Sequence, residues 1–216
     1  VWNGSSPAAQ KVPQGKPTTT VDLASYFVAP SGSGVLTFND ADKTSIQVTE
    51  PDGATTATLT GSKLGLTLDG TKLTGSIAAG APTGVYTITF DAKNDKGYAP
   101  NDKGQPSFTM TVTGLPAWTG KNPGNQTKDR TIPINDINLA SYFNSPDDSG
   151  NVSFDPSKSG SIMVTYKGST TSLEGSSLWA KGQGIHLSGN TLTGSIPATA
   201  AIGDYTITFK ANNDVG

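Results

Sequence analysis

The sequence contains no cysteine among its 216 residues. This absence excludes disulfide bonds, thiolate metal sites and cysteine nucleophiles. Charged side chains make up only 15% of the chain, the net charge is −2, and basic residues form no cluster. Nucleic acids and anionic membrane surfaces would therefore be attracted only weakly. No apolar run reaches the length of about 18 residues that a membrane-spanning helix requires, so no membrane insertion is predicted.

Runs rich in leucine, or in alanine, glutamate and lysine, are also missing, which disfavours long helices. The chain contains 26 glycines and 14 prolines, and its apolar content is 33%. This composition, with abundant threonine and serine, is typical of β-strands joined by turns. The absence of disulfides from such a chain favours a bacterial or archaeal surface over a metazoan one, where β-sandwiches often carry them.

One strand pattern occurs twice, at Gly84–Phe90 and at Gly203–Phe209. In both copies tyrosine, isoleucine and phenylalanine alternate with threonine, which predicts a strand with one apolar and one hydroxylated face. A strand of this kind lines a core. The repeat therefore predicts two copies of one β-domain, which we place at residues 1–115 and 116–216.

Other segments repeat with nearly the same spacing. The five residues Leu23–Phe27 return unchanged as Leu139–Phe143. We expect a short buried turn in each copy, with Phe27 and Phe143 inside the core. Alternating apolar residues and a Gly-containing tight turn predict further strands in the first copy at 17–23, 35–38, 46–48, 65–68 and 71–77, and their counterparts in the second, among them 131–139 and 152–154.

The first copy ends with a strand pattern, residues 107–113, that the second copy lacks. The chain starts at Val1 without methionine and stops at Gly216, the counterpart of Gly97, so we expect a piece of a longer polypeptide. Two explanations stay open. Either the second copy is truncated, or it presents unpaired backbone groups at a sheet edge, to which another chain can add a strand.

The segments Asp22–Phe27, Gly65–Gly70 and Gly84–Phe90 together resemble the bacterial cadherin-like and immunoglobulin-like tandem repeats. The resemblance covers most of each copy. It implies an all-β fold of two tandem Greek-key immunoglobulin/cadherin-like β-sandwiches, with a role in adhesion, surface-layer building or spacing. It also implies that Tyr86 and Tyr205 are tyrosine corners, whose hydroxyl groups bond to nearby backbone.

The sequence departs from the calcium-binding members of such repeats, which carry an Asp-x-Asp-Gly-Asp loop. The first copy has residues 30–34 without a carboxylate, and the second copy has only Asp147 and Asp148. Calcium takes about six to eight oxygen ligands, several of them from carboxylates. Asp147 and Asp148 are therefore either ligands of a calcium ion or turn-forming residues that need no ion. No other cofactor is predicted.

Two of the three tryptophans, Trp2 and Trp118, are counterparts near the start of each copy. We expect each indole to cover the end of its own sandwich or the adjacent junction. The alternative is a platform that binds a sugar or a protein partner. Trp179 is the better candidate for that role, because it has no counterpart in the first copy and lies in the most variable stretch of the repeat.

The sequence offers little material for catalysis. His186 is the only histidine, and the two glutamates, Glu50 and Glu174, lie outside the repeated motifs. No catalytic residues are predicted, because a fold alone implies no reaction and only a site does. We expect His186 to be an outward-facing residue of a strand.

These observations predict a non-catalytic structural or adhesive module of an extracellular, prokaryotic cell-surface protein, with self-assembly by strand-edge pairing as one mechanism. Its partners would be other copies of itself, neighbouring domains of a longer chain, or glycans. The alternative prediction is a carbohydrate-contacting accessory module of a secreted enzyme.

Overall fold

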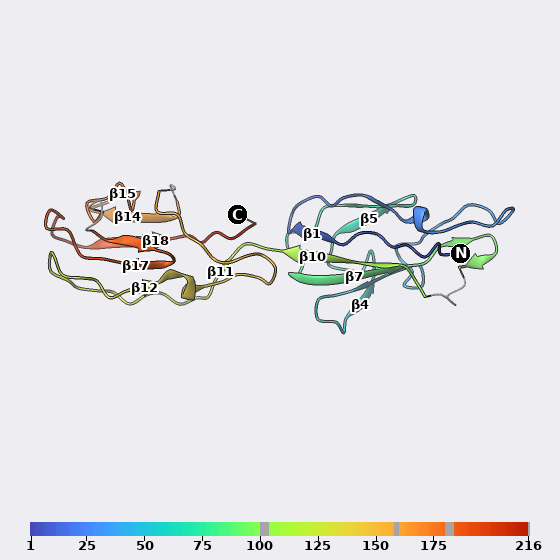
Figure 1. Ribbon diagram of the computed structural model, residues 1–216, viewed down its shortest axis with the longest axis horizontal. Helices are drawn as coiled ribbons and strands as arrows, with labels where there is room; N and C mark the ends of the chain where they lie inside the picture. Colours follow the sequence, from blue (N-terminus) through green and yellow to red (C-terminus); the bar gives the residue numbers. More distant parts are fainter. Residues whose placement is uncertain (100–103, 158–159, 180–183, 216) are drawn as a thin grey trace. The chain divides into compact units, whose positions relative to one another are not determined.

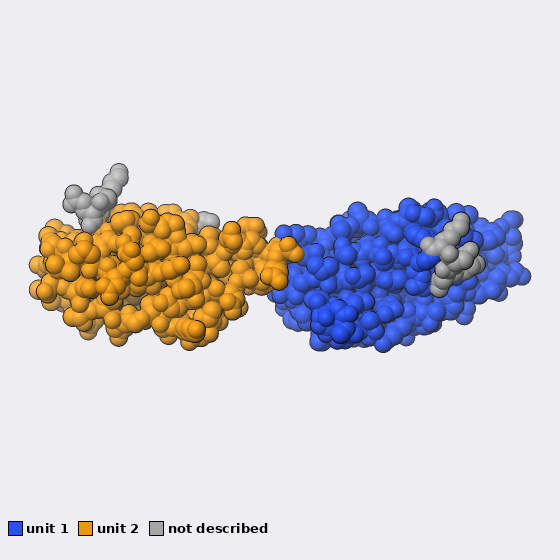
Figure 2. All heavy atoms as spheres, turned by 60° about the horizontal axis from the view of Figure 1, so that its bottom comes forward, with its two compact units in different colours: residues 1–114 blue, residues 115–216 orange. Residues whose placement is uncertain are grey.

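The computed structural model describes residues 1–99, 104–157, 160–179 and 184–215. The chain divides into two compact units, Val1–Gly114 (unit 1) and Leu115–Gly216 (unit 2), which Figure 2 colours blue and orange. The division lies one residue before the boundary proposed from the repeat. Within the described residues, no helix is long and apolar enough to cross a bilayer.

Unit 1 consists of a five-stranded sheet in the order β1-β10-β7-β3-β4, a three-stranded sheet in the order β2-β6-β5, and the hairpin β8-β9 (Figure 1). Both larger sheets contribute side chains to one core, so they form the two layers of a sandwich. The elements are β1 (Gln10–Pro13), β2 (Val21–Asp22), the 3-10 helix η1 (Leu23–Tyr26), β3 (Ile46–Thr49), β4 (Thr56–Thr58), β5 (Leu66–Asp69), β6 (Lys72–Gly75), β7 (Gly84–Phe90), β8 (Lys93–Asn94), β9 (Gly97–Tyr98) and β10 (Ser107–Thr113).

Unit 2 repeats this plan with fewer paired strands. Its sheets have the orders β15-β14-β18 and β12-β17-β16, and a short pair joins β11 to β13. The elements are β11 (Ala117–Trp118), β12 (Ile137–Asn138), the 3-10 helix η3 (Leu139–Tyr142), β13 (Phe143–Asn144), β14 (Ile162–Tyr166), β15 (Ser169–Ser172), β16 (His186–Ser188), β17 (Thr191–Thr193) and β18 (Tyr205–Phe209).

The alternation in β7 produces the centre of the unit 1 core. Tyr86, Ile88 and Phe90 are at most 1% exposed, whereas Thr87 and Thr89 between them keep contact with solvent. Each buried side chain of this size stabilises the fold by about 2 kcal/mol. The prediction that this strand lines a core is confirmed.

The identical segments at 23–27 and 139–143 form 3-10 helices and not simple turns. Each begins with a side-chain cap: the carboxylate of Asp22 accepts a bond from the N–H of Ala24 at 3.2 Å, and Oδ1 of Asn138 accepts one from the N–H of Ala140 at 3.1 Å. A capped first turn satisfies N–H groups that would otherwise lack a partner. The buried residue of each helix is its leucine.

The prediction of strands at 35–38 and 152–154 is wrong. Within these two segments, only Thr37 and Ser153 pair, each in an isolated bridge, with Lys93 and Asn212 respectively. Val35 is 79% exposed, because the polar, glycine-rich loop before it carries the backbone across the surface before a single bridge restores pairing. The strands expected at 17–23 and 131–139 are likewise reduced to β2 and β12.

The tight turns between β5 and β6 and between β16 and β17 are as predicted. The pairs Asp69↔Lys72 and Ser188↔Thr191 close two-residue loops. Gly70 has φ 60° and Gly189 has φ 58°, a left-handed conformation that glycine adopts without steric cost.

The strand β1 was missed by the sequence analysis. It pairs in parallel with β10, with the register Gln10↔Met110 to Pro13↔Thr113. Val12 is its buried residue. The counterpart of Val12 in unit 2 is Lys128, and residues 126–129 form no strand.

Candidate functional site

The two strand tyrosines make the bond expected of tyrosine corners. Each hydroxyl group donates to the carbonyl oxygen four residues upstream at 3.0 Å, from Tyr86 to Pro82 and from Tyr205 to Ala201. Burial, together with the negative charge of Glu50, raises the pKa of Tyr86 to about 12, so its hydroxyl keeps its proton and remains a donor at any physiological pH. These residues support the fold and offer no reactive group.

The two repeated phenylalanines occupy equivalent aromatic clusters. Phe27 lies edge-on to Phe90 at a centroid distance of 6.0 Å, and Phe143 lies edge-on to Phe209 at the same distance. Phe27 is buried, whereas Phe143 is only half-buried. The difference indicates that the aromatic cluster of unit 2 is less completely covered.

Trp2 and Trp118 both turn their indole N–H groups into the local backbone, to the carbonyl oxygens of Ser5 at 2.6 Å and Lys121 at 2.8 Å. Their surroundings differ. Trp2 packs against the unit 1 core, with Gly104 of the segment leading into β10 beside it. Trp118 is 57% exposed, so it presents indole surface to solvent.

Trp179, the residue expected to provide a contact platform, is half-buried and packs against the core of unit 2. Its backbone N–H donates to the carbonyl of Ser176 at 3.2 Å. Of the three tryptophans, Trp118 therefore has the larger free aromatic face. The larger exposure of Trp118 than of Trp179 could not be predicted from the sequence, because it depends on which segments cover each indole.

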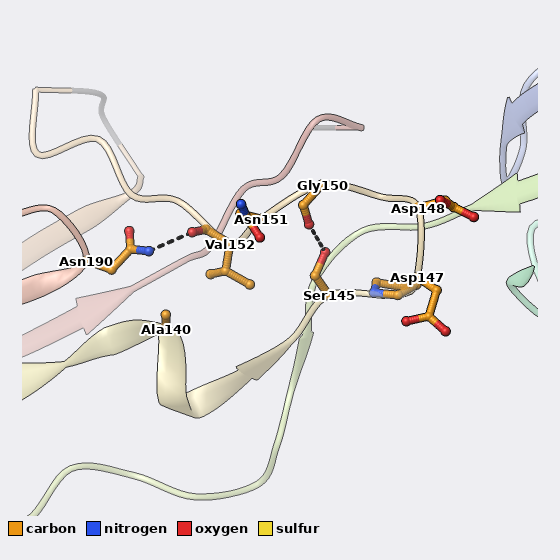
Figure 3. Close-up of a pocket in the computed structure, with 9 residues that line it drawn as sticks. Ala140, Ser145, Asp147, Asp148, Gly150, Asn151, Val152 and Asn190 are labelled. Carbon is orange, nitrogen blue, oxygen red and sulfur yellow. Dashed lines mark hydrogen bonds between the residues drawn. The ribbon is translucent and has the colours of Figure 1, made fainter.

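Asp147 and Asp148 lie in a loop beside a shallow, open pocket that also includes Ser145, Gly150 and Asn190 (Figure 3). Figure 3 shows that the two carboxylates do not converge on one point. The pocket wall is held by bonds from the hydroxyl of Ser145 to the carbonyl of Gly150 and from the amide of Asn190 to the carbonyl of residue 152.

Asp148 has a conformational role in this loop. Its φ is 59°, and its counterpart Gly32 has φ 72°, so both copies need a left-handed residue at this point. Aspartate tolerates that conformation better than most residues. Within the described residues, no group of three or more His, Asp or Glu side chains is placed to hold a metal ion. Calcium at Asp147 and Asp148 stays a prediction.

Two residues weighed for catalysis are held in structural roles. Nδ1 of His186 lies 2.9 Å from the carbonyl oxygen of Gly184, at the start of β16 and away from the β16-β17 turn. Glu50 is buried, and its carboxylate accepts a bond from the N–H of Lys63 at 3.2 Å. A buried carboxylate with a backbone partner was not anticipated from the sequence.

The outer edge of β18 distinguishes unit 2 from unit 1. In unit 1 the corresponding edge of β7 pairs antiparallel with β10, from Ser107↔Thr89 to Val112↔Gly84. In unit 2, β18 pairs with β14 alone among the strands that the structure describes (Figure 1). An edge without a neighbour presents backbone donors and acceptors to any strand that approaches it.

The apolar face of β18 is less completely buried than that of β7. Tyr205, Ile207 and Phe209 are all partly exposed, whereas their counterparts in β7 are at most 1% exposed. These three side chains still pack against the core of unit 2, but each keeps part of its apolar surface accessible beside the sheet edge. We therefore regard the β18 edge, defined as residues 204–210, as the candidate functional site.

No protein-family model and no curated protein matches the chain. Among solved structures, it is similar to three Ig domains of titin, I67-I69 in an E-to-A mutated variant, with 14% identity and a TM-score of 0.41. That match covers 99% of this chain, which spans 60% of the titin chain. It is also similar to extracellular domains 3-5 of Drosophila OTK, with 13% identity, a TM-score of 0.27, and coverage of 100% and 93%.

The predicted fold class is confirmed in that the chain is all-β and forms two tandem units, each with its own sheets and its own core. The resemblance to bacterial cadherin-like repeats in particular stays a prediction.

Proposed function

We propose that the chain is a non-catalytic structural or adhesive module of an extracellular, prokaryotic surface protein, in which unit 1 bears load between neighbouring domains. The observation that carries this proposal is the parallel pairing of β1 with β10. These strands are the first and last long strands of unit 1, so tension along the chain acts on both.

The direction of the pairing determines how the sheet resists that tension. A force on the N-terminal end of β1 and an opposite force on the C-terminal end of β10 slide two parallel strands past each other. Sliding loads all the hydrogen bonds between them together, because these bonds lie across the strands. In an antiparallel arrangement the same force would open the bonds one after another.

Single-molecule pulling on the full chain tests this role. We expect two unfolding events, with unit 1 opening at the higher force, because residues 126–129 of unit 2 form no strand that could act as β1 does. Val12→Pro removes an N–H group on the side of β1 that faces β10 and should lower the higher-force event alone. The counterpart Lys128→Pro should change neither event. A higher-force event that survives Val12→Pro would contradict the load-bearing role.

The exposed indole of Trp118 favours a second candidate, a carbohydrate-contacting accessory module. Aromatic faces of this kind offer both apolar area and a polar edge to a ligand. A titration of tryptophan fluorescence with polysaccharides tests it. Trp118→Ala should abolish the response and the matched Trp2→Ala should preserve it, whereas an unresponsive wild-type chain excludes this function.

A further inference from the structure

The first loop of unit 1 contains the only Asn-Gly dipeptide in the sequence, at Asn3 and Gly4. The fold holds this loop at both ends. Nε1 of Trp2 donates to the carbonyl of Ser5 at 2.6 Å, which closes the loop on itself. Nδ2 of Asn3 donates to the carbonyl of Ser25 at 2.9 Å, which fixes the asparagine side chain beside η1.

The oxygen of the Asn3 side chain accepts two hydrogen bonds from one residue. The N–H of Ser5 donates to Oδ1 at 3.0 Å, and the hydroxyl of Ser5 donates to the same atom at 2.5 Å. The first bond makes an Asx-turn, which folds the side chain back over the peptide that follows it. Two donors on one carbonyl oxygen stabilise the negative charge that develops there when its carbon is attacked. Cγ of Asn3 is therefore an activated electrophile.

The backbone nitrogen of Gly4 is the nucleophile closest to Cγ along the chain, because its attack closes a five-membered ring. The N–H of Gly4 donates to no partner among the residues that the structure describes. Gly4 is exposed, its φ is 89°, and a Cβ at its position would have nothing within 4 Å. Neither a hydrogen bond nor a neighbouring side chain hinders the approach of this nitrogen to Asn3.

Three other asparagines form an Asx-turn whose next nitrogen is engaged. Asn94, Asn138 and Asn213 each accept a bond from the N–H two residues on. In all three turns the intervening N–H donates to a carbonyl, as that of Leu139 does to Asn190 at 2.8 Å. A nitrogen held in this way must first break its hydrogen bond before it can attack the side chain.

Two further Asx-turns lack one of the two conditions. Asn39 accepts a bond from the N–H two residues on, but the next nitrogen belongs to Asp40, whose negative charge opposes the loss of a proton there. Asp52 is followed by glycine, but the N–H of Gly53 donates to the carbonyl of Glu50 at 2.9 Å. Among the described asparagines that form an Asx-turn, Asn3 alone is followed by glycine.

We propose that Asn3 is a self-modification site, at which the folded chain converts the side-chain amide into a carboxylate without an enzyme. The deprotonated nitrogen of Gly4 bonds to Cγ of Asn3, and the electron pair of the C=O bond moves to Oδ1. The intermediate collapses, the bond from Cγ to Nδ2 breaks, and Nδ2 takes a proton from water and leaves as ammonia. A second water molecule opens the resulting succinimide to aspartate or isoaspartate.

The product weakens the hold of the loop on η1. A carboxylate oxygen, which can only accept, takes the place of Nδ2 opposite the carbonyl of Ser25. Isoaspartate also lengthens the backbone by one carbon atom directly after Trp2, which bridges to Phe27 and packs against the unit 1 core. Modification should therefore loosen the indole cover at this end of unit 1.

Peptide mass spectrometry of the full chain, sampled during incubation at constant pH, locates the reaction. Asn3 should convert at least about tenfold faster than Asn138, because the N–H of Leu139 is hydrogen-bonded. The rate should rise with pH, since the nucleophile is the deprotonated nitrogen. Ser5→Ala removes one donor from Oδ1 and should slow the conversion about tenfold. Conversion of Asn3 no faster than that of Asn138, or a rate indifferent to Ser5→Ala, overturns the proposal.

Unit 2 offers a matched gain-of-function test, because its first loop has the same plan without the electrophile. Nε1 of Trp118 donates to the carbonyl of Lys121, the N–H of Lys121 donates to Oγ1 of Thr119 at 3.4 Å, and Gly120 has φ 83°. Thr119→Asn should create a second site, and adding Lys121→Ser should accelerate it. Thr119→Gln would need a six-membered ring and should stay unmodified. An inert Thr119→Asn overturns the assignment of the reaction to this loop.

Calorimetry measures the consequence for unit 1. Asn3→Asp, which carries the product carboxylate from the start, should lower the unfolding temperature of unit 1 and leave that of unit 2 unchanged. A wild-type chain incubated to full conversion should show at least the same decrease, because isoaspartate adds to the effect of charge. A fully converted chain with an unchanged unit 1 transition overturns the loosening of the loop.

Discussion

Equivalent residues of the two units adopt the same backbone conformation even where the residue type differs. Gly15 has φ 73° and its counterpart Thr131 has φ 66°, and their N–H groups donate to equivalent carbonyls, those of Ile77 and Ile196. The turn is therefore set by its hydrogen bond. A β-branched residue is strained in this left-handed conformation, whereas glycine is not.

Substitution at this turn should change the stabilities of the two units in opposite directions. We expect Thr131→Gly to stabilise unit 2 by about 1 kcal/mol, because the strain of the left-handed threonine is released. Gly15→Thr should destabilise unit 1 by a similar amount, although open space surrounds the glycine. Denaturant unfolding of each variant measures the change in the free energy of unfolding. Equal free energies of unfolding for Thr131→Gly and wild type would show that Thr131 is not strained in its left-handed conformation.

Asp91 gives unit 1 a dependence on pH. It is 1% exposed, and its Oδ2 has no hydrogen-bond partner among the described residues. Burial raises the pKa of this carboxyl above its ordinary value, against the smaller opposing effect of the bond from Gln105. The folded form therefore holds the proton more tightly than the unfolded form. This contribution to stability is fully present below a pH of about 3.9 and is lost as pH rises through the raised pKa.

Asp91→Asn should remove this dependence. We expect the variant to be more stable than wild type at pH 7 by about 1 kcal/mol, the lower end of the cost of an unsatisfied buried group. Calorimetry of the full chain between pH 3 and pH 7 measures the effect. The unit 2 transition, where Lys210 replaces Asp91, serves as the internal control. A variant with the same pH profile as wild type would show that Asp91 is not the responsible group.

At the scale of elements, the tyrosine corner links each central strand to the loop before it. In unit 1 this tyrosine is buried and in unit 2 it is partly exposed. Tyr86→Phe should cost about 1.5 kcal/mol, because the carbonyl of Pro82 loses its partner at a part-buried position. Tyr205→Phe should cost about 0.5 kcal/mol, because water can replace the hydroxyl group at Ala201. Thermal unfolding of the two variants measures both costs. An equal loss of stability in the two units would show that the burial of the tyrosine does not determine the cost.

The elements also show how far the sequence could predict the fold. The pattern at 84–90 was sufficient for β7 because alternation is a local property. The strand β1 was missed because it contains one buried valine, and its partner lies roughly 100 residues away. The half-burial of Phe143 and the exposure of Trp118 also lay outside prediction, since both depend on segments that pack over them. The repeat predicts the β18 edge, whereas the replacement of Val12 by Lys128 is informative only once β1 is known to be a strand.

At the scale of the whole molecule, the two units should differ in stability. The buried apolar core comprises 19 residues in unit 1 and 10 in unit 2, counted over the described part of the chain. Calorimetry should therefore show two transitions, with unit 2 unfolding first.

The repeated leucine identifies the transitions. Leu23→Ala should lower the upper transition alone and Leu139→Ala the lower one alone, each by about 2 to 5 kcal/mol in the free energy of unfolding. Both leucines are at most 1% exposed. A single transition that both variants shift would show that the units unfold together.

The pairing of β1 with β10 also sets the order of events during synthesis. The residues Gln10–Pro13 have their strand partner at the far end of unit 1, so they remain unpaired until Thr113 has left the ribosome. At elongation rates of about 5 to 20 residues per second, that delay lasts roughly 5 to 20 seconds. The edge of β7 is open for a shorter time, about 1 to 5 seconds, because Phe90 precedes Thr113 by only 23 residues. Exposed sheet edges promote aggregation. The early chain is therefore the species that a chaperone would have to protect.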